Sequence, residues 1–507
     1  MPHKHFPLNI RHMDPTHNPG LSKSTFLMGR QCSKLLWFRY NAKDQIPAPD
    51  ANQQAVFDQG TEVGELAQQL FPGGIEIDTE PGEFDAAIRL TQEALKHRRP
   101  IYEATFSFGG GYARADILVP VAGGAWDLVE VKSTTSLKED VHLPDIAFQR
   151  FVLTGAGIKI RKCFLAHINN EFVRHGPVDP QKFFTLEDVT RPVSILSRDI
   201  GEQIDAMQRV IGAKAHPVIE IGPHCDNPYT CALHDHCWSF LPEASVFTLY
   251  RGGKKSFALL KQGIQKLVDI PADVTLTDNQ AIQRSVLIGG KPHIDRPALA
   301  AFLSQLEYPV SYLDFETIGT AIPLFDNSGP YRQIPFQYSL HVVRQPGAAP
   351  VHVSHLAAGT ADPRPEFMRH LVKNLPATGS VVTYNANFET SRLKECCEQL
   401  PEFKPWLRKL TPRIVDLLLP FRGFRYHHPH QDGSASMKAV LPALTGQGYE
   451  KLTIQEGGAA SREFLRVTFG DVPAAERRLV RQALEEYCAL DTLGMVQIVD
   501  QLKQLTA

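Results

Sequence analysis

Acidic residues stand at spacings that suit a divalent metal ion in two separate parts of this 507-residue chain. In the first half, Asp116 precedes the closely spaced pair Glu130 and Lys132. In the second half, Asp314 and Glu316 stand two residues apart. Carboxylates are hard oxygen ligands that suit Mg²⁺ or Mn²⁺, and a bound divalent ion can activate water as a nucleophile. The sequence therefore predicts two metal-dependent hydrolytic sites.

A predicted β-hairpin brings the first set of charged residues together. The apolar runs YARADILVPV and AWDLVEVKS are separated only by a short AGG turn. If Val121 pairs with Ala125, Asp116 lies directly opposite Glu130, and Lys132 shares the same face because side chains alternate along a strand. The three charges then converge and favour a metal ion. The alternative is an exposed hairpin with a solvated charged patch.

Four of the eight cysteines have a placement that predicts a metal cluster. These four are Cys32, Cys225, Cys231 and Cys237. The last three lie in the polar loop HCDNPYTCALHDHC, whose histidines are zinc-compatible alternatives. Four thiolates suit a cubane iron–sulfur cluster or a structural zinc ion, and four unconnected thiols remain the third interpretation. The other cysteines, expected to be small buried residues without a role, are Cys163, Cys396, Cys397 and Cys488.

Three predicted elements carry the second acidic set. The apolar strand YPVSYLDFETIG projects Asp314 and Glu316 on one side. The segment SVVTYNANFETSRL reads as a strand, a turn and a helix, with Glu389 near the bend. A long amphipathic C-terminal helix places Tyr487 and Asp491 one turn apart on the same face. An aspartate within a mostly apolar stripe is explained by a bound metal ion.

Composition restricts the class of protein. With 43% hydrophobic and 21% charged residues, the chain has the makeup of a globular protein. A net charge of −2 argues against a protein that coats nucleic acid with a strongly basic surface. No apolar run reaches the roughly 20 residues that span a bilayer. We expect a cytoplasmic protein without a membrane partner, and a flexible tail over residues 1–20.

The first half resembles the iron–sulfur branch of the RecB-like nucleases in the PD-(D/E)XK superfamily, over residues 21–240. The resemblance implies that Asp116 and Glu130 hold Mg²⁺ or Mn²⁺, and that Lys132 and Gln149 complete the catalytic site. It also implies that the four clustered cysteines hold a [4Fe–4S] cluster, with zinc as the alternative. The cluster would join the two ends of the domain.

The chain departs from this family at two positions. The family's proline before the metal-binding aspartate is Ala115 here, and its upstream histidine is replaced by Gly64. Glu62 and Glu65 are candidates to replace the histidine. Glu103, in the strand-like segment IYEATFSF, is a further candidate member of the site.

The second half resembles the DEDD exonucleases of the RNase H-like superfamily, in the subgroup with a tyrosine in its last motif, over residues 306–507. By this resemblance, four carboxylates bind two divalent ions and Tyr487 positions the nucleophile. Glu389 stands where the family has an aspartate, and Asp416 is a second candidate for that role. The implied ligands are Asp314, Glu316, Glu389 and Asp491.

Together these features predict an α/β (mixed α+β) chain of two nuclease modules. A restriction-endonuclease-like core with its cluster covers residues 21–240, a helical connector covers 241–305, and an RNase H-like mixed sheet flanked by helices covers 306–507. The basic and aromatic loop 421–440 has two interpretations: it binds phosphates and stacks on a base, or it is an ordinary solvated loop. The whole resembles an uncharacterised bacterial family that carries both modules.

The expected function is metal-dependent hydrolysis of nucleic acid, as an exonuclease in defence or repair. DNA is favoured over RNA as the substrate, with 3′-to-5′ polarity for the second module and a helicase or defence system as partner. One alternative is an RNA-processing exonuclease. The other is a nucleic-acid binding or assembly protein in which one or both sites are inactive.

Overall fold

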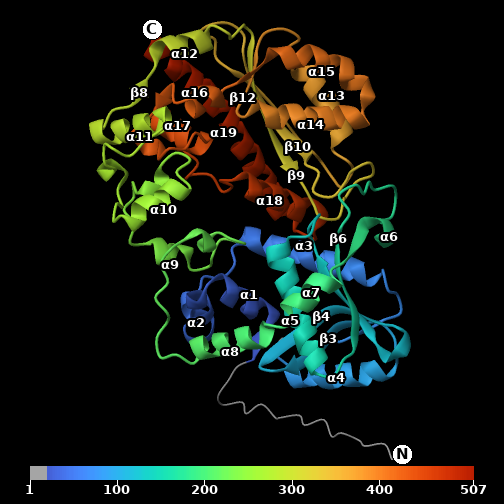
Figure 1. The fold of residues 1–507 in the computed structure, drawn as a ribbon. Helices are drawn as coiled ribbons and strands as arrows, with labels where there is room; N and C mark the ends of the chain where they lie inside the picture. The colour runs from blue at the N-terminus through green and yellow to red at the C-terminus, as the bar shows by residue number, and fades with distance from the viewer. Residues whose placement is uncertain (1–19, 81) are drawn as a thin grey trace, which may run out of the picture. The chain divides into compact units, whose positions relative to one another are not determined.

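The computed structural model describes residues 20–80 and 82–507, which form a mixed α/β chain as the sequence predicts (Figure 1). These residues divide into two compact units, one of the described residues up to 239 and the other of residues 240–507. The predicted tail falls almost wholly outside the described residues. Among the helices that the structure describes, none combines the length and the apolar character needed to cross a membrane.

A seven-stranded sheet forms the centre of the first unit. Its spatial order is β2-β3-β4-β5-β6-β7, and β1 pairs with the early part of β4. Strands β4 and β5 are antiparallel, with Ile117 opposite Val129, which confirms the predicted register and sets Asp116 against Glu130. The strands are β1 (Leu21–Ser22), β2 (Ile75–Glu76), β3 (Ile101–Phe108), β4 (Gly111–Pro120), β5 (Trp126–Lys132), β6 (Ile160–Ile168) and β7 (Phe184–Asp188).

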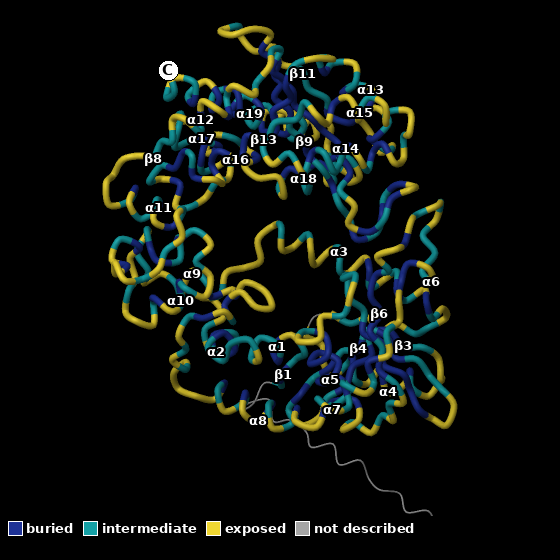
Figure 2. The backbone as a smooth tube through the Cα atoms, turned by 45° about the horizontal axis from the view of Figure 1, so that its top comes forward, coloured by how far each residue is buried: buried dark blue, intermediate teal, exposed yellow. Residues whose placement is uncertain are grey.

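Helix α5 covers the strands that carry the first candidate site. It packs on β3, β4 and β6, and its Phe148 stacks on Phe26 with ring centroids 4.8 Å apart. Gly111 permits this approach, because a Cβ there would lie 2.9 Å from a methyl group of Val152. The result is a core in which most strand residues are buried (Figure 2).

The helices of the first unit are α1 (Lys23–Gln31), α2 (Ser33–Asn41), α3 (Ala51–Gln68), α4 (Phe84–Lys96), α5 (Glu139–Gly155), α6 (Pro180–Phe183), α7 (Thr190–Leu196), α8 (Ile200–Ile211) and α9 (His234–Trp238).

The second unit is built on a five-stranded mixed sheet in the order β11-β10-β9-β12-β13. Strands β9, β12 and β13 are parallel to one another, whereas β10 and β11 are antiparallel to their neighbours. A separate two-stranded sheet joins β14 to β8. The strands are β8 (His293–Ile294), β9 (Val310–Ile318), β10 (Ile334–Val343), β11 (Val351–Leu356), β12 (Val381–Thr383), β13 (Ile414–Asp416) and β14 (Tyr426–His427).

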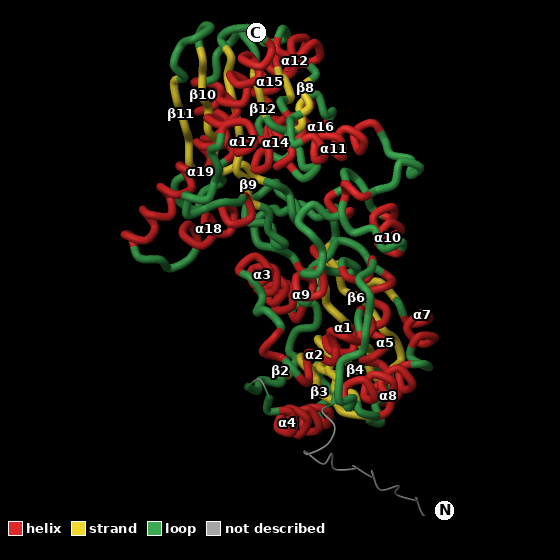
Figure 3. The backbone as a smooth tube through the Cα atoms, turned by 90° about the vertical axis from the view of Figure 1, so that its left-hand side faces the viewer, coloured by secondary structure: helices red, strands yellow, loops and turns green. Residues whose placement is uncertain are grey.

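Helices cover both faces of this sheet, and side-chain alternation in β9 separates two cores (Figure 3). Tyr312 lies in the core that includes α19, whereas Leu313 and Phe315 pack in the core that includes α13. Because alternate residues share a face, Asp314 and Glu316 belong to the α19 side. The predicted connector, residues 241–305, holds the helices α10, α11 and α12 and the short strand β8, and it clusters with the second unit.

The helices of the second unit are α10 (Lys254–Lys261), α11 (Asp278–Gly289), α12 (Arg296–Leu303), α13 (Arg364–Asn374), α14 (Ala386–Gln399), α15 (Lys404–Leu410), α16 (Leu418–Arg422), α17 (Met437–Thr445), α18 (Gly457–Phe469) and α19 (Ala474–Thr506).

Candidate metal-binding sites

The first candidate site joins the β4–β5 hairpin to α5. The side-chain amide of Gln149 donates to Oε2 of Glu130 at 2.6 Å, and Nζ of Lys132 lies 2.6 Å from Oε1 of the same carboxylate. Asp116 accepts the backbone N–H of Val131 through Oδ2 at 2.8 Å. The structure therefore brings together all four residues predicted for this site, and Glu130 is fully buried among them.

Two further residues complete this network, and sequence reasoning assigned neither of them a role. Asp145, one helical turn before Gln149, binds Nζ of Lys132 through Oδ2 at 2.6 Å. Lys23, at the start of α1, places its Nζ 2.8 Å from Oε1 of Glu130 and 3.2 Å from Oδ1 of Asp116. Asp145 is buried on α5.

Charges of both signs shift the pKa values in this first site. Burial and the nearby Glu130 raise the pKa of Asp116 to about 7. Burial alone would raise the pKa of Glu130, but Lys132 and Lys23 hold it far below its ordinary value.

The amide oxygen of Gln149 is buried without a hydrogen-bond partner among the described residues. This oxygen is a buried acceptor without a donor among those residues, and the amide of the same side chain contacts the carboxylates of Glu130 and Asp145. Such a group is suited to bind a cation.

Glu103, the further candidate member of this site, lies beside Asp116. It falls opposite Asp116 in the β3–β4 register, yet it is left out of the ladder with φ at +60°. It forms an ion pair with Arg114 at 3.0 Å, and its charge contributes to the raised pKa of Asp116. Strained backbone of this kind clusters at functional sites. Glu62 and Glu65 are exposed on α3.

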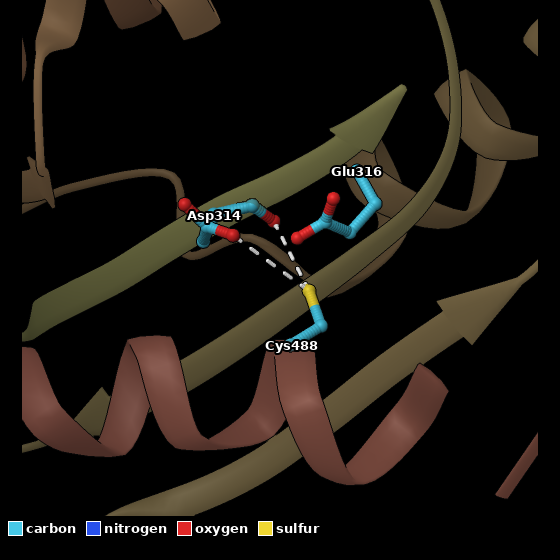
Figure 4. Close-up of side chains that lie close together, drawn as sticks. All are labelled: Asp314, Glu316 and Cys488. Carbon is cyan, nitrogen blue, oxygen red and sulfur yellow. Dashed lines mark hydrogen bonds between the residues drawn. The ribbon is translucent and has the colours of Figure 1, made fainter. Parts of the chain in front are cut away.

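The second candidate site lies between β9 and α19. Oxygen atoms of Asp314 and Glu316 and the sulfur of Cys488 all lie within 4.8 Å of one another (Figure 4). Asp491 and Tyr487 extend from α19, and the charge of Asp491 raises the pKa of both β9 carboxyls. These residues form one acidic cluster at the end of β9.

Cys488 and Tyr449 are members of this cluster that sequence reasoning missed. Cys488 was expected to be an inert buried thiol, and it is fully buried, but its sulfur lies 3.8 Å from Oδ2 of Asp314. The hydroxyl of Tyr449 donates to Oδ1 of Asp491. Cys488 could have been found from its place three residues before Asp491 on the predicted helix, a spacing that puts both side chains on one face. Tyr449 lies in irregular sequence without such a signal.

Burial dominates the electrostatics of the second site. It raises the pKa of Glu316 to about 8, and that of Asp491 to about 7 despite the hydrogen bond from Tyr449. The pKa of Asp314 is raised well above its ordinary value, first by burial and then by its acidic neighbours. None of these three carboxylates forms an ion pair with a residue that the structure describes. Glu316 is buried, Asp314 and Asp491 are half-buried, and a group of adjacent carboxylates without a cationic partner fits divalent cations.

Glu389 and Asp416 were alternatives for one ligand position, and their surroundings differ. Glu389 is 2% exposed, burial raises its pKa to about 8, and its Oε2 has no hydrogen-bond partner among the described residues. Oδ1 of Asp416 instead accepts the backbone N–H groups of Asn385 and Leu418, each at 3.0 Å. Asn385 adopts φ of +81° at the start of α14. Asp416 therefore stabilises the turn that positions Glu389.

The loop 421–440 differs from the nucleic-acid-binding interpretation at two of its residues. Tyr426 and His427 are buried, and His427 stacks on Phe424 with ring centroids 4.3 Å apart. These two rings belong to the packing of the small sheet and are not available to stack on a base. Lys438 is exposed. Burial raises the pKa of Glu316 and Asp491, and the positive charge of Lys438 partly opposes that rise.

The four predicted cluster cysteines line a single cavity in the first unit. They come from the α1–α2 junction and from the segment 223–238, which includes α9. The side-chain amide of Gln31 ties the two segments together by donating to the carbonyls of His224 and Tyr229 at 2.9 and 2.7 Å. Burial, followed by the other three thiols, raises the pKa of Cys231 to about 11. All four thiols are free of disulfides.

Comparison with known proteins finds one family model and several uncharacterised relatives. Residues 311–436 match a family model described as a domain of unknown function (DUF2779). An uncharacterised protein of Mycoplasma genitalium is 27% identical over 207 residues, which is 37% of this chain and 31% of that protein. An uncharacterised protein of Ureaplasma parvum is 23% identical over 230 residues, 41% of this chain and 33% of that protein. The chain thus covers about a third of these relatives. The family match includes Asp314, Glu316 and Glu389 but ends before Asp491.

Proposed function

We propose that this protein is a metal-dependent nuclease with two active sites, most closely comparable to a RecB-like nuclease fused to a DEDD-type exonuclease. The observation that carries the proposal is the second acidic cluster. Four carboxylates from β9, α14 and α19 form no ion pair with a described residue, and of these Glu316 and Glu389 are buried whereas Asp314 and Asp491 are half-buried. Such a cluster is unfavourable without cations, and two-metal phosphodiester hydrolysis is its best-matched chemistry.

In the second site, each chain residue has a definable task. Asp314, Glu316, Glu389 and Asp491 would hold Mg²⁺ or Mn²⁺, which supplies Lewis acidity and activates water. Tyr487 would orient that water from α19, one helical turn before Asp491. Tyr449 would fix the orientation of Asp491 through its hydrogen bond. The longer side chain of Glu389 reaches the cluster from the first turn of α14.

In the first site, the hairpin and α5 supply one metal position. Asp116 and Glu130 would be the ligands, while Lys132 stays beside Glu130 and can stabilise charge on the phosphate. Asp145 and Gln149 support the site from α5, because both bind the groups that would contact the metal or substrate. The two sites therefore share a reaction and differ in how their carboxylates are balanced.

We propose that the cysteines hold a [4Fe–4S] cluster, with zinc as the alternative. The four thiols line one cavity, and a cubane cluster takes four thiolates, each bound to a different iron atom.

End-labelled single-stranded DNA and RNA, incubated with Mn²⁺, test the proposal. The wild-type chain is expected to shorten DNA, and Asp116→Ala and Asp314→Ala should each remove a different part of the product pattern. Loss of 3′-to-5′ shortening in Asp314→Ala would assign that polarity to the second site.

Three outcomes would change the proposal. A wild-type chain that binds DNA but cuts neither polymer would support the inactive binding protein instead. Preferential cutting of RNA would replace DNA as the substrate. A colourless protein with stoichiometric zinc after anaerobic purification would contradict the iron–sulfur assignment.

A further inference from the structure

Lys23 occupies an unusual position in the first site. Its ammonium bridges the two carboxylates proposed to bind metal, at 2.8 Å from Glu130 and 3.2 Å from Asp116. These contacts use Oε1 of Glu130 and Oδ1 of Asp116, which are oxygens that a divalent ion would need. Lys132 is different, because its ammonium also binds Asp145 and is therefore held on the α5 side of the site.

The fold delivers Lys23 to this position directly. Strand β1 pairs with the first residues of β4, and β5 pairs with the later ones, so Asp116 lies where β4 changes partner. Lys23 follows β1 at once and is the first residue of α1. Its backbone is fixed by a capping box in which Ser22 and Thr25 bond reciprocally. Only the flexible side chain is left free to move.

Electrostatics explain why a lysine stands there. A cation at the first position of a helix is disfavoured by the positive end of the helix dipole. Here the two carboxylates offset that cost, because each lies within ion-pair distance of the ammonium. The lysine therefore neutralises an acidic pair whose repulsion would otherwise strain the metal-free site.

We propose that Lys23 is an internal stand-in for the metal ion, which holds Asp116 and Glu130 in place and leaves them when a divalent cation binds. This inference rests on the proposed function of the first site. Metal binding then includes the cost of displacing the lysine, so the first site needs a higher metal concentration than its carboxylates alone would. The side chain, 27% exposed, has a route out toward solvent.

Calorimetric titration with Mn²⁺ tests the exchange in the full chain. Comparison with Asp116→Ala identifies the heat that belongs to the first site. Lys23→Met is expected to bind Mn²⁺ there roughly tenfold more tightly or better, because a competing cation has been removed. Lys159→Met, which alters an exposed lysine elsewhere in the unit, should bind like the wild type.

A second measurement needs no variant at Lys23. Amine acylation followed by mass spectrometry reports whether Lys23 of the wild-type protein is protected. Mn²⁺ is expected to increase acylation of Lys23 while leaving Lys159 unchanged.

The outcomes distinguish failure of the proposed Lys23 displacement from failure of the proposed metal binding at the first site. One outcome is that Mn²⁺ binds at the first site while the affinity of Lys23→Met and the acylation of Lys23 both stay unchanged. That result would refute the displacement of Lys23 by the metal ion and leave the proposed metal site intact. Weaker Mn²⁺ binding by a folded Lys23→Met would also overturn the exchange. If Asp116→Ala loses no Mn²⁺ binding, the metal function of the first site fails as well.

Discussion

Two tyrosines approach Asp491 from different elements, and their positions imply different tasks. Tyr487 stands on the same helix, whereas Tyr449 comes from the segment between α17 and α18 and bonds the carboxylate. Their ring centroids are 6.0 Å apart. One hydroxyl is therefore committed to orienting a metal ligand, while the other has no such bond and is proposed to orient water.

Substitution of the two tyrosines should separate metal binding from chemistry. In an Asp116→Ala background, Tyr449→Phe is expected to weaken Mn²⁺ binding and slow cleavage, because a hydrogen bond to a charged group contributes about 1.5–3 kcal/mol. Tyr487→Phe should leave Mn²⁺ affinity near the wild-type value and reduce the cleavage rate. Equal effects of both substitutions on calorimetric affinity would contradict this division.

The acidic cluster also predicts how stability depends on pH. Burial raises the pKa of Glu316 and of Glu389 from 4.5 to about 8, so the metal-free folded state holds protons that the unfolded state releases. Stability from these groups is present below pH 4.5 and is lost as pH rises toward 8. Thermal unfolding in a metal chelator should therefore show a falling midpoint over this range.

Glu316→Gln provides the control for the pH effect. It should flatten the fall, and Mn²⁺ should restore more stability to the wild type at pH 8 than at pH 5. A midpoint that rises with pH in the chelator, or does not respond to Glu316→Gln, would count against the cluster electrostatics.

Local spacing predicts some site residues, whereas others require the folded chain. The pairing of Asp116 with Glu130 can be predicted from the alternation of side chains along the two strands of a hairpin, because that signal lies in neighbouring residues. Lys23 reaches Asp116 across 93 residues of sequence and Glu130 across 107, and it follows a two-residue strand too short to show a pattern. Tyr449 meets Asp491 in the same way, across 42 residues. Tertiary contacts of this kind leave no periodic signal.

At the scale of elements, the cysteine cavity joins α2 to the loop that precedes α9. Cys32 lies between α1 and α2, and the other three cysteines lie about two hundred residues later. A metal centre that connects such distant segments is expected to stabilise the fold, as bound metals do when the unfolded chain lacks a formed site.

Loss of one cluster thiol should loosen one end of the first unit. Cys231→Ser is expected to reduce iron content and to expose the segment around residues 225–237 to proteolysis. Cys163→Ala, at a buried cysteine of β6, should retain the iron and the protection. Unchanged metal content in Cys231→Ser would show that the thiols are independent.

Strand periodicity predicted elements well where a strand was long and half-buried. It set the β4–β5 register and located β9, because alternation there separates two cores. It could not predict the backbone of Glu103, which lies within β3 but leaves the ladder at positive φ. Such an irregularity depends on the charges around the strand and not on its own sequence pattern.

For the whole molecule, each compact unit has its own core and its own acidic cluster. The first cluster is balanced by Lys23 and Lys132, whereas the second forms no ion pair with a described residue. We therefore expect the second site to depend more steeply on metal for its stability. The chain as a whole should carry two separable activities, because substitutions at independent sites usually add.

The most direct test of two metal-dependent sites is quantitative hydrolysis of end-labelled DNA by the wild type, Asp116→Ala, Asp314→Ala and the double variant, with Mn²⁺ and with chelator. Each single variant should keep part of the wild-type activity, and the double variant should release no labelled product, as should the wild type in chelator. A folded double variant that cuts DNA at the wild-type rate, or a wild type that cuts nothing, would contradict the account.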